Sequence, residues 1–450
     1  MSKIPSKTFC TLPWIHLNTQ PNGDIYPCCM APYGDSIGNT KDNTLKEVWN
    51  GDDMKSIRKD MLKGERPKAC SRCFLIEDAG MHSPRHTHNK LFNDQIEDLI
   101  KDTDPETGHN PNFNLKYWDF RWSNICNFKC RMCGVFSSSK WAEDEPALYG
   151  TKIEAKGGII AYNDTAKEDV MQYVDKHIHE VEEIYFAGGE PIVMEEHYLI
   201  LEKLIKAGRT DVRLRYNTNF SHLKFKKWDL FGMWQKFIDD PKGNIQLFAS
   251  LDAIGKLAEV IRSGTKWNVV ESNIKRCVEA GMEVHFSPTV SLLNIFYIHE
   301  LIELAEKVGI NVNCVNLNNL LTHPNIYDIR ILPDYLKEKL CKQLDDYIAD
   351  RRHNPYIGVL EFGYSAWKNH MYTEISYNKS QAEIELLRNT VLLDRRRKED
   401  FLEVNPQFTE WFADIRTRID NPKFFDDKIT DKERKTVATP SIEKGKPKVI

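Results

Sequence analysis

The stretch Cys126-Asn127-Phe128-Lys129-Cys130-Arg131-Met132-Cys133 places three cysteines at the spacing CxxxCxxC. It closely follows the run Leu115-Lys116-Tyr117-Trp118-Asp119-Phe120-Arg121, whose apolar and aromatic residues favour a strand. A disulfide framework belongs to short secreted chains, whereas closely spaced thiols in a large chain are typical of metal or cluster ligands. The motif therefore predicts a metal or cluster site at the end of a strand.

Two kinds of site fit three thiols at this spacing. Three thiolates can bind three irons of a [4Fe–4S] cube, which leaves the fourth iron open to a small chelating molecule. The alternative is a zinc knuckle, but structural zinc takes four ligands, usually from paired CxxC units. The spacing favours the cluster.

Downstream of the motif, short apolar runs alternate with stretches of helical periodicity, such as residues 294–308. Strands separated by helices predict parallel βα units with right-handed crossovers. Six units predict an α/β fold with an open, partial (βα)6 TIM-like barrel, whose active residues lie at the carboxyl ends of the strands. The expected strands are residues 115–121, 183–187, 212–217, 245–251, 282–289 and 311–317.

The CxxxCxxC motif and the order of the predicted strands and helices together resemble the radical S-adenosylmethionine (SAM) superfamily over most of residues 115–320. The resemblance implies that Cys126, Cys130 and Cys133 hold a [4Fe–4S] cluster at which SAM is cleaved reductively. The resulting 5′-deoxyadenosyl radical then abstracts hydrogen from a substrate. In this family the position before the third cysteine is often aromatic and packs near adenine, and Met132 can fill that space here.

The resemblance also covers residues that bind SAM. Ala187-Gly188-Gly189-Glu190-Pro191 is similar to the GGE motif, in which backbone and carboxylate meet the methionine amino group. Ser250 and Asp252 share one face of the fourth strand and resemble the pair at the ribose or carboxylate end of SAM. Arg262 is placed to bind the SAM carboxylate. Four polar residues at strand ends are further candidates, with a purely structural role equally expected: Asn217, Asn219, Thr289 and Asn294.

A second cysteine pattern occupies the N-terminal segment. It comprises Phe9-Cys10, Gly23-x4-Cys28-Cys29 and the closing pair Cys70-x2-Cys73. Over residues 7–76 it resembles the SPASM/twitch auxiliary-cluster module, which usually follows the barrel rather than preceding it.

That resemblance implies an auxiliary [4Fe–4S] cluster for electron transfer with the substrate radical, held by Cys10, Cys28, Cys70 and Cys73. Adjacent side chains point apart, so Cys29 is expected to be a spare, although the sequence leaves Cys28 and Cys29 open. The same thiolates also suit zinc. The rival hypothesis is therefore a zinc-binding structural or interaction protein that uses both cysteine groups.

Alternation along the predicted strands places polar residues on the inner face of the barrel. These charges either pair with one another or bind a polar or anionic substrate. Asp119 and His285 are then candidates for proton transfer. The twitch resemblance favours a peptide or protein substrate, whereas the polar barrel interior favours a polar small molecule.

Composition narrows the partners. The 450 residues include 62 Lys+Arg and 66 Asp+Glu, so the net charge is 62 − 66 = −4, which disfavours a dedicated nucleic-acid binder. The basic run Arg395-Arg396-Arg397-Lys398 is flanked by acidic residues and predicts a solvated helix. No apolar stretch reaches the roughly 18 residues of a membrane span, and the start has no secretory core. We expect a cytoplasmic enzyme served by a low-potential electron donor such as flavodoxin or ferredoxin.

Changes in composition and periodicity along the chain predict five regions. They are an auxiliary-cluster domain at 1–80, a polar connector at 81–112, the partial barrel at 113–322, a helical C-terminal extension at 323–420 and a mobile tail at 421–450.

Overall fold

The computed structural model describes residues 4–78, 82–150, 158–161, 166, 169–419 and 421–428. The chain divides into two units, each built from separate segments. Unit 1 comprises Met1–Asn124, Ile160–Tyr216 and Gly232–Ile245, and unit 2 comprises Ile125–Ile159, Asn217–Phe231 and Gln246–Ile450. Most of the predicted mobile tail, residues 429–450, lies outside the described residues.

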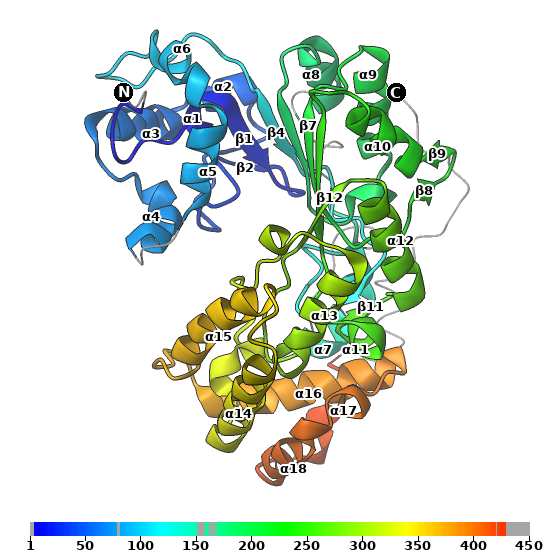
Figure 1. The fold of residues 1–450 in the computed structure, drawn as a ribbon. Coiled ribbons are helices and arrows are strands. Elements are labelled where there is room, and N and C mark those ends of the chain that lie inside the picture. Colours follow the sequence, from blue (N-terminus) through cyan, green and yellow to red (C-terminus); the bar gives the residue numbers. More distant parts are fainter. Residues whose placement is uncertain are drawn as a thin grey trace, which may run out of the picture. The chain divides into compact units, whose positions relative to one another are not determined.

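Unit 1 contains the N-terminal cysteine-rich segment and the first strands of the predicted barrel (Figure 1). Its strand order is β7-β6-β4-β1-β2-β3. Neighbouring strands are parallel from β7 to β1, whereas β2 and β3 continue the sheet in antiparallel fashion. The strands are β1 (His16–Thr19), β2 (Asp24–Tyr26), β3 (Gly38–Asn39), β4 (Tyr117–Phe120), β6 (Glu183–Phe186) and β7 (Arg213–Thr218), the last of which continues into unit 2.

Short helices surround these strands in unit 1. The region predicted as a polar connector contains two of them, and it lacks helix only from about residue 101, where Pro105 and Gly108 follow. The helices are α1 (Leu12–Ile15), α2 (Leu45–Trp49), α3 (Asp52–Lys63), α4 (Ser71–Asp78), α5 (Pro84–Leu91), α6 (Ile96–Ile100), α8 (Val170–His177) and α9 (Glu195–Lys206).

Strand β1 joins the cysteine-rich segment to the barrel strands. It pairs in parallel with β4, so that His16 lies opposite Tyr117 and Asn18 opposite Asp119. The rings of His16 and Tyr117 stack with centroids 4.3 Å apart, and Asn18 Nδ2 donates to Asp119 Oδ2 at 2.7 Å. The auxiliary segment and the first barrel strand therefore share one sheet, a pairing that the sequence analysis did not predict.

Unit 2 contains the CxxxCxxC loop and the later βα units (Figure 1). Strands β10 (Asn244–Ala249) and β12 (Glu283–Phe286) are parallel and bury every second residue, as strands do when helices cover one face. The short strand β5 (Lys129–Cys130) pairs antiparallel with β11 (Arg262–Ser263). The connecting helices are α7 (Glu145–Tyr149), α11 (Gly255–Ile261), α12 (Trp267–Glu279) and α13 (Ile298–Val308).

Segment 217–245 returns the chain from unit 2 to unit 1. It forms the hairpin β8 (Lys224–Phe225) and β9 (Trp228–Asp229), followed by α10 (Leu230–Ile238).

The prediction of a sixth strand over residues 311–317 is wrong. Val312–Cys314 form the 3₁₀ helix η7, and only an isolated parallel bridge joins Val315 to Phe286. The side chain of Asn311 accepts a hydrogen bond from the backbone N–H of Asn313 and so stabilises the turn. Asparagine side chains compete with strand pairing in this way.

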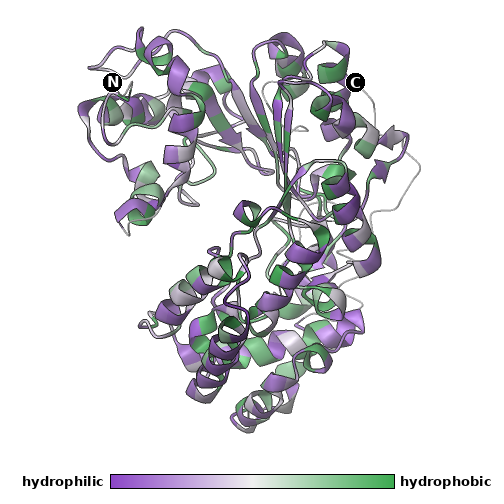
Figure 2. Ribbon diagram, in the orientation of Figure 1, coloured by the Kyte–Doolittle hydropathy of each residue, from purple (hydrophilic) through white to green (hydrophobic). Residues whose placement is uncertain are grey.

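The C-terminal part of unit 2 is helical. In Figure 2 these helices carry both hydrophobic and hydrophilic stretches, as helices do that bury one face only. They are α14 (Asp334–Asp350), α15 (Ile357–Met371), α16 (Lys379–Arg397), α17 (Phe401–Val404) and α18 (Thr409–Thr417). Among the described residues, no helix is both long enough and apolar enough to cross a membrane.

Candidate functional site

The CxxxCxxC cysteines of unit 2 lie in a loop that turns at β5. The thiols of Cys130 and Cys133 share a hydrogen bond, and this bond together with the Arg262 guanidinium lowers the pKa of Cys130 to about 7 despite its burial. The same bond and burial raise the pKa of Cys133, with a further contribution from Cys126. The three thiols therefore lie close together, and one is held near its thiolate form. Such a donor set fits three ligands of an iron–sulfur cluster.

Asp252 organises the residues next to these thiols. Its Oδ2 accepts from Arg262 Nε at 2.7 Å, and its Oδ1 accepts from the Thr289 backbone N–H at 2.8 Å. Asn294 Nδ2 donates to the Asp252 carbonyl at 2.9 Å. Because Arg262 Nη1 also lies 3.6 Å from Cys130 Sγ, this group directly adjoins the cysteine loop.

The remaining predicted SAM-binding residues of unit 2 lie outside the hydrogen-bonded group around Asp252. Met132 and Ser250 are half-buried and Asn217 is exposed. Asn219 donates from Nδ2 to Asn127 Oδ1 at 2.9 Å, and Asn127 in turn donates to Ser221 Oγ. Asn127 occupies a variable position inside the cysteine motif, so no sequence signal pointed to this contact.

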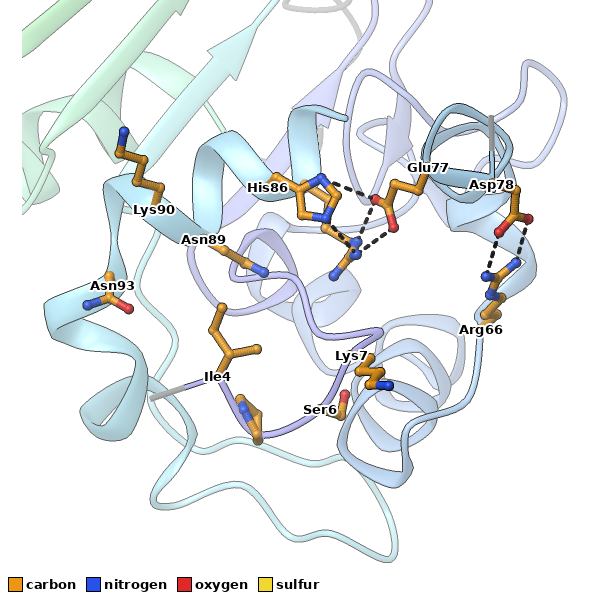
Figure 3. A pocket seen from close by; sticks show the side chains of 12 residues that line it. Ile4, Ser6, Lys7, Arg66, Glu77, Asp78, His86, Asn89, Lys90 and Asn93 are labelled. Atoms are coloured by element: carbon orange, nitrogen blue, oxygen red, sulfur yellow. Dashed lines mark hydrogen bonds and ion pairs between the residues drawn. The ribbon is translucent and has the colours of Figure 1, made fainter. Parts of the chain in front are cut away.

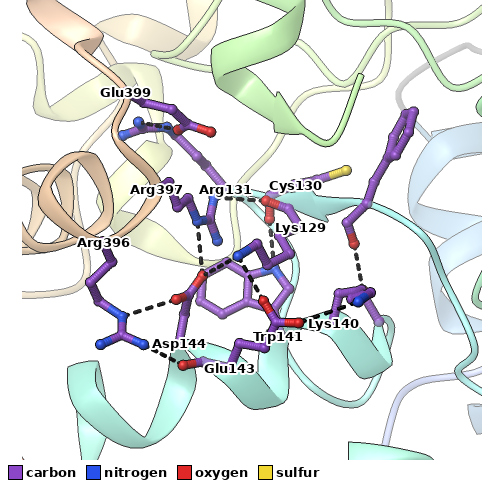
Figure 4. Close-up of polar contacts among 12 residues, drawn as sticks. Lys129, Cys130, Arg131, Lys140, Trp141, Glu143, Asp144, Arg396, Arg397 and Glu399 are labelled. Carbon is purple, nitrogen blue, oxygen red and sulfur yellow. Dashed lines mark hydrogen bonds and ion pairs between the residues drawn. The ribbon is translucent and has the colours of Figure 1, made fainter. Parts of the chain in front are cut away.

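Residues of helix α16 and of the turn that follows it contact the cysteine loop (Figure 4). Arg131, between Cys130 and Met132, pairs with Asp394 and with Glu399, the latter at 2.9 Å, and its Nε donates to the Val260 carbonyl. The Arg131 side chain is only 1% exposed. The loop is therefore fixed by carboxylates more than 260 residues away in the chain.

A second set of charges extends this support. Arg397 Nη1 donates to the Lys129 carbonyl at 2.7 Å, and Arg396 and Arg397 both pair with Asp144 (Figure 4). Trp141 Nε1 donates to the Cys130 carbonyl at 2.8 Å. The prediction of a solvated helix for the basic run 395–398 is thus wrong for Arg396 and Arg397, because their partners come from a distant segment that charge patterning along the sequence cannot reveal.

The glycine-rich turn lies in unit 1. Gly188 and Gly189 have φ of +81° and +50°, a region that side chains disfavour. A Cβ on Gly188 would lie 2.9 Å from Arg121 Cβ, so the backbone also approaches that side chain closely. Glu190 is buried, and its carboxylate accepts from the Ile192 N–H at 3.5 Å. The turn therefore places a buried carboxylate next to two half-buried glycines.

Four cysteines of the N-terminal segment gather in unit 1. Cys10 precedes α1, Cys28 follows β2, Cys70 ends the 3₁₀ helix η1 (Lys68–Cys70) and Cys73 lies in α4. Burial raises the pKa of each thiol, and neighbouring thiols raise it further for Cys10, Cys28 and Cys70. All four are free. Buried thiols that interact in this way become stable thiolates when a metal or cluster binds them, so the set fits an auxiliary cluster.

Cys29 differs from these four. Burial and then Asp119 raise its pKa to about 11, whereas Arg121 and Arg215 lower it. Its strongest electrostatic neighbours are therefore barrel-strand residues, while those of Cys28 include Cys70 and Cys10. Cys28 as the ligand stays a prediction, since Cys29 also has a thiol neighbour in Cys73.

Arg85 lies next to the auxiliary cysteines. Its Nη1 donates to the Phe9 carbonyl at 2.6 Å, next to Cys10, and its Nε donates to Glu77 Oε1 at 2.9 Å. The guanidinium lowers the pKa of Cys10, Cys70 and Cys73 against the larger effect of burial. Arg85 and Glu77 also line a pocket shown in Figure 3, together with His86 and Lys90 of α5.

Charges on the barrel strands of unit 1 pair with one another. Arg121 Nε contacts Asp119 Oδ1 at 3.1 Å, and Arg215 Nη1 contacts Glu183 Oε1 at 3.2 Å. Asp119 is fully buried, and both its oxygens are engaged by Asn18 and Arg121. His285, the other proton-transfer candidate, lies on β12 in unit 2, where Nε2 is 2.7 Å from Glu283 Oε1.

Comparison with known families assigns both cysteine groups. Residues 10–74 match the SPASM family, described as an iron–sulfur cluster-binding domain, and residues 120–308 match the radical SAM superfamily. No curated protein sequence is significantly similar to the chain.

Three of the similar solved structures are of SuiB from Streptococcus suis. The first shows SuiB bound to the precursor peptide SuiA, with 13% identity and a TM-score of 0.33, and covers 82% of this chain and 76% of that one. The second shows SuiB, with 13% identity and a TM-score of 0.32, and covers 84% of this chain and 77% of that one. The third shows SuiB bound to S-adenosylmethionine, with 13% identity, a TM-score of 0.33 and the same coverage of 84% and 77%.

The two matched regions cover the cysteines, the glycine turn and the Asp252–Arg262 pair. The predicted resemblance is confirmed, and with it the partial-barrel fold class and the cofactors. The chain belongs to the radical SAM superfamily and is an enzyme whose cofactors are a [4Fe–4S] cluster, SAM and an auxiliary iron–sulfur cluster in a SPASM domain that precedes the barrel.

Proposed function

We propose that this enzyme cleaves SAM reductively at the cluster held by Cys126, Cys130 and Cys133 and abstracts hydrogen from a peptide or a polar small molecule. The observation that carries the proposal is the group of cysteine thiols with the Asp252–Arg262 pair beside it. A thiolate donor set and a guanidinium meet there, as a cluster and the carboxylate of its SAM ligand require.

The residues of unit 2 bind and orient SAM. Asp252 fixes the Arg262 guanidinium through Nε, so its orientation is set before any ligand binds. Arg262 is then ready to donate to the SAM carboxylate, while Thr289 and Asn294 keep Asp252 in place. A reduced cluster bound there would supply the electron for cleavage of SAM into methionine and a 5′-deoxyadenosyl radical.

The likeness of Gly188, Gly189 and Glu190 to the GGE motif assigns them to the methionine ammonium of SAM. The left-handed glycines leave backbone groups accessible, and the Glu190 carboxylate accepts from the methionine ammonium. The Glu190 side chain is buried, and a buried carboxylate is stabilised by such a cation.

The auxiliary cluster is assigned to Cys10, Cys28, Cys70 and Cys73, with electron transfer to or from the substrate radical as its role. Four thiols, of which those of Cys10 and Cys73 are buried, support this assignment, because a cluster with four protein ligands leaves no iron open for a substrate. A small electron-transfer protein such as flavodoxin or ferredoxin supplies the reducing electron.

The pairing of charges on the unit 1 strands bears on the substrate. Asp119 pairs with Arg121, whereas Glu183 faces both Arg213 and Arg215, so these strands carry one guanidinium in excess of their carboxylates. In this proposal the Asp119 carboxylate fixes the position of the Arg121 side chain, which lies close to Gly188. A polar or anionic group of a peptide or small-molecule substrate fits this surface.

The test uses anaerobically purified protein with dithionite and SAM. Native protein should produce 5′-deoxyadenosine, and Cys130→Ala should abolish it. Cys277→Ala, a buried cysteine of α12 outside both cysteine groups, is the matched control and should keep the activity. SAM cleavage that survives in a variant lacking Cys126, Cys130 and Cys133 would refute the proposal. Iron-free native protein containing only zinc would favour the zinc-binding alternative instead.

A further inference from the structure

Glu283, His285 and Cys314 of unit 2 bring three metal-ligating side chains together away from both cysteine groups. One donor atom from each lies within 4.8 Å of the other two. Glu283 and His285 alternate along β12 on the face opposite Val284 and Phe286, which are buried. Cys314 ends η7, and the bridge between Val315 and Phe286 sets that turn beside β12.

Two neighbours on β10 orient the donors. Gln246 lies opposite Glu283 and donates from Nε2 to Glu283 Oε1 at 3.1 Å. Phe248 lies opposite His285, and the two rings stack with centroids 4.4 Å apart at 16°. Outer partners that fix the carboxylate and imidazole planes are a regular feature of metal sites.

The donor chemistry selects one class of metal. A thiolate, a carboxylate and a neutral imidazole together carry two negative charges, which balance a divalent cation. Thiolate and imidazole ligands favour zinc over magnesium or calcium, which prefer oxygen. Both side chains of β12 remain reachable, since Glu283 is 38% and His285 16% exposed.

We propose that Glu283, His285 and Cys314 form a mononuclear zinc site that neither cysteine cluster shares. Three protein ligands leave the fourth position of a tetrahedral zinc ion open, the arrangement of sites that bind water or a substrate oxygen. The site lies on the face of β12 opposite the buried side chains of Val284 and Phe286. A polar oxygen of a substrate is the group that it would bind.

The proposal gives His285 a different role from proton transfer, because the metal uses the lone pair of one ring nitrogen. It also assigns a role to Cys314, which lies outside both cysteine groups. It does not depend on the proposed function, because none of its ligands belongs to a cluster.

The experiment measures iron and zinc in anaerobically purified full-length protein, supplied with one equivalent of zinc sulfate and desalted. We expect about one zinc in addition to the cluster iron. Cys314→Ser and, separately, His285→Gln should lose the zinc and keep the iron, whereas the control Cys277→Ser should keep both. X-ray absorption at the zinc edge should show a single sulfur at about 2.3 Å with nitrogen and oxygen at about 2.0–2.2 Å.

Three results would overturn the site. They are absence of zinc from the supplied native protein, retention of zinc in both Cys314→Ser and His285→Gln, or a zinc shell of four sulfurs. The last result would place zinc in the N-terminal cysteine group. Loss of 5′-deoxyadenosine production with normal zinc binding would instead contradict the proposed function alone, so the two ideas fail separately.

Discussion

Replacing Arg131 by methionine tests whether helix α16 holds the cluster loop. The change removes a guanidinium from between Asp394 and Glu399, whose side chains are 19% and 12% exposed. Removing one partner of a buried ion pair costs about 3–5 kcal/mol because the remaining charge is left uncompensated. Both carboxylates keep some contact with water, and Asp394 still accepts from the Phe401 N–H. We therefore expect the lower end, about 3 kcal/mol, or roughly 150-fold in the population of the ordered loop.

The cost falls on the cluster loop because Arg131 lies between two of its cysteines. Arg131→Met should lower the iron content from about eight towards about four per chain, since two cubes of four become one. SAM-dependent production of 5′-deoxyadenosine should fall with it. Iron analysis and electron paramagnetic resonance with and without SAM measure both effects.

Two further variants make this test specific. Arg395→Met, on the same helix, removes a guanidinium that donates to the Phe425 carbonyl, and it should keep full iron content. Adding Asp394→Asn to Arg131→Met removes one uncompensated charge and should restore part of the iron. An Arg131→Met protein with native iron content and SAM affinity would refute the supporting role of α16.

The remaining predictions concern ligand binding and pH. Glu190→Gln and Arg262→Lys should each weaken SAM binding by roughly ten- to a hundredfold at unchanged iron content, because each weakens a charge-assisted hydrogen bond worth about 1.5–3 kcal/mol; calorimetric affinities equal to the native value would show that the site lies elsewhere. Replacing Cys70 and Cys73 together should lower the iron from about eight to about four per chain while SAM cleavage without substrate persists, whereas unchanged iron content would remove the auxiliary assignment. Burial lowers the pKa of His197 to about 3. Since the unfolded-state pKa is about 6.5, its stabilisation is complete above pH 6.5 and is lost as the pH falls towards 3, by about 2 kcal/mol at pH 5. His197→Gln should therefore flatten the fall in melting temperature between pH 7 and 5 measured by circular dichroism, and an unchanged profile would contradict this.

The sequence by itself determined the local chemistry of this protein. Cysteine spacing and the glycine-rich turn depend on residues a few positions apart, so Cys126, Cys130, Cys133 and the GGE motif could be recognised directly. Five of the six predicted strands form as named strands among the described residues: β7, β10 and β12 alternate between buried and more exposed residues, whereas β4 and β6 are short apolar runs buried on both faces. The sixth fails where asparagine side chains stabilise a turn instead.

Only the tertiary structure decided which distant segments meet. The parallel pairing of β1 with β4 joins residues about 100 positions apart, and neither strand specifies its neighbour through its own pattern. The basic run at Arg396 and Arg397 looks solvated along the chain, yet Asp144 and the Lys129 carbonyl bury it. A charge is stable inside a protein only when a partner reaches it, and the folded chain, not the local sequence, supplies that partner.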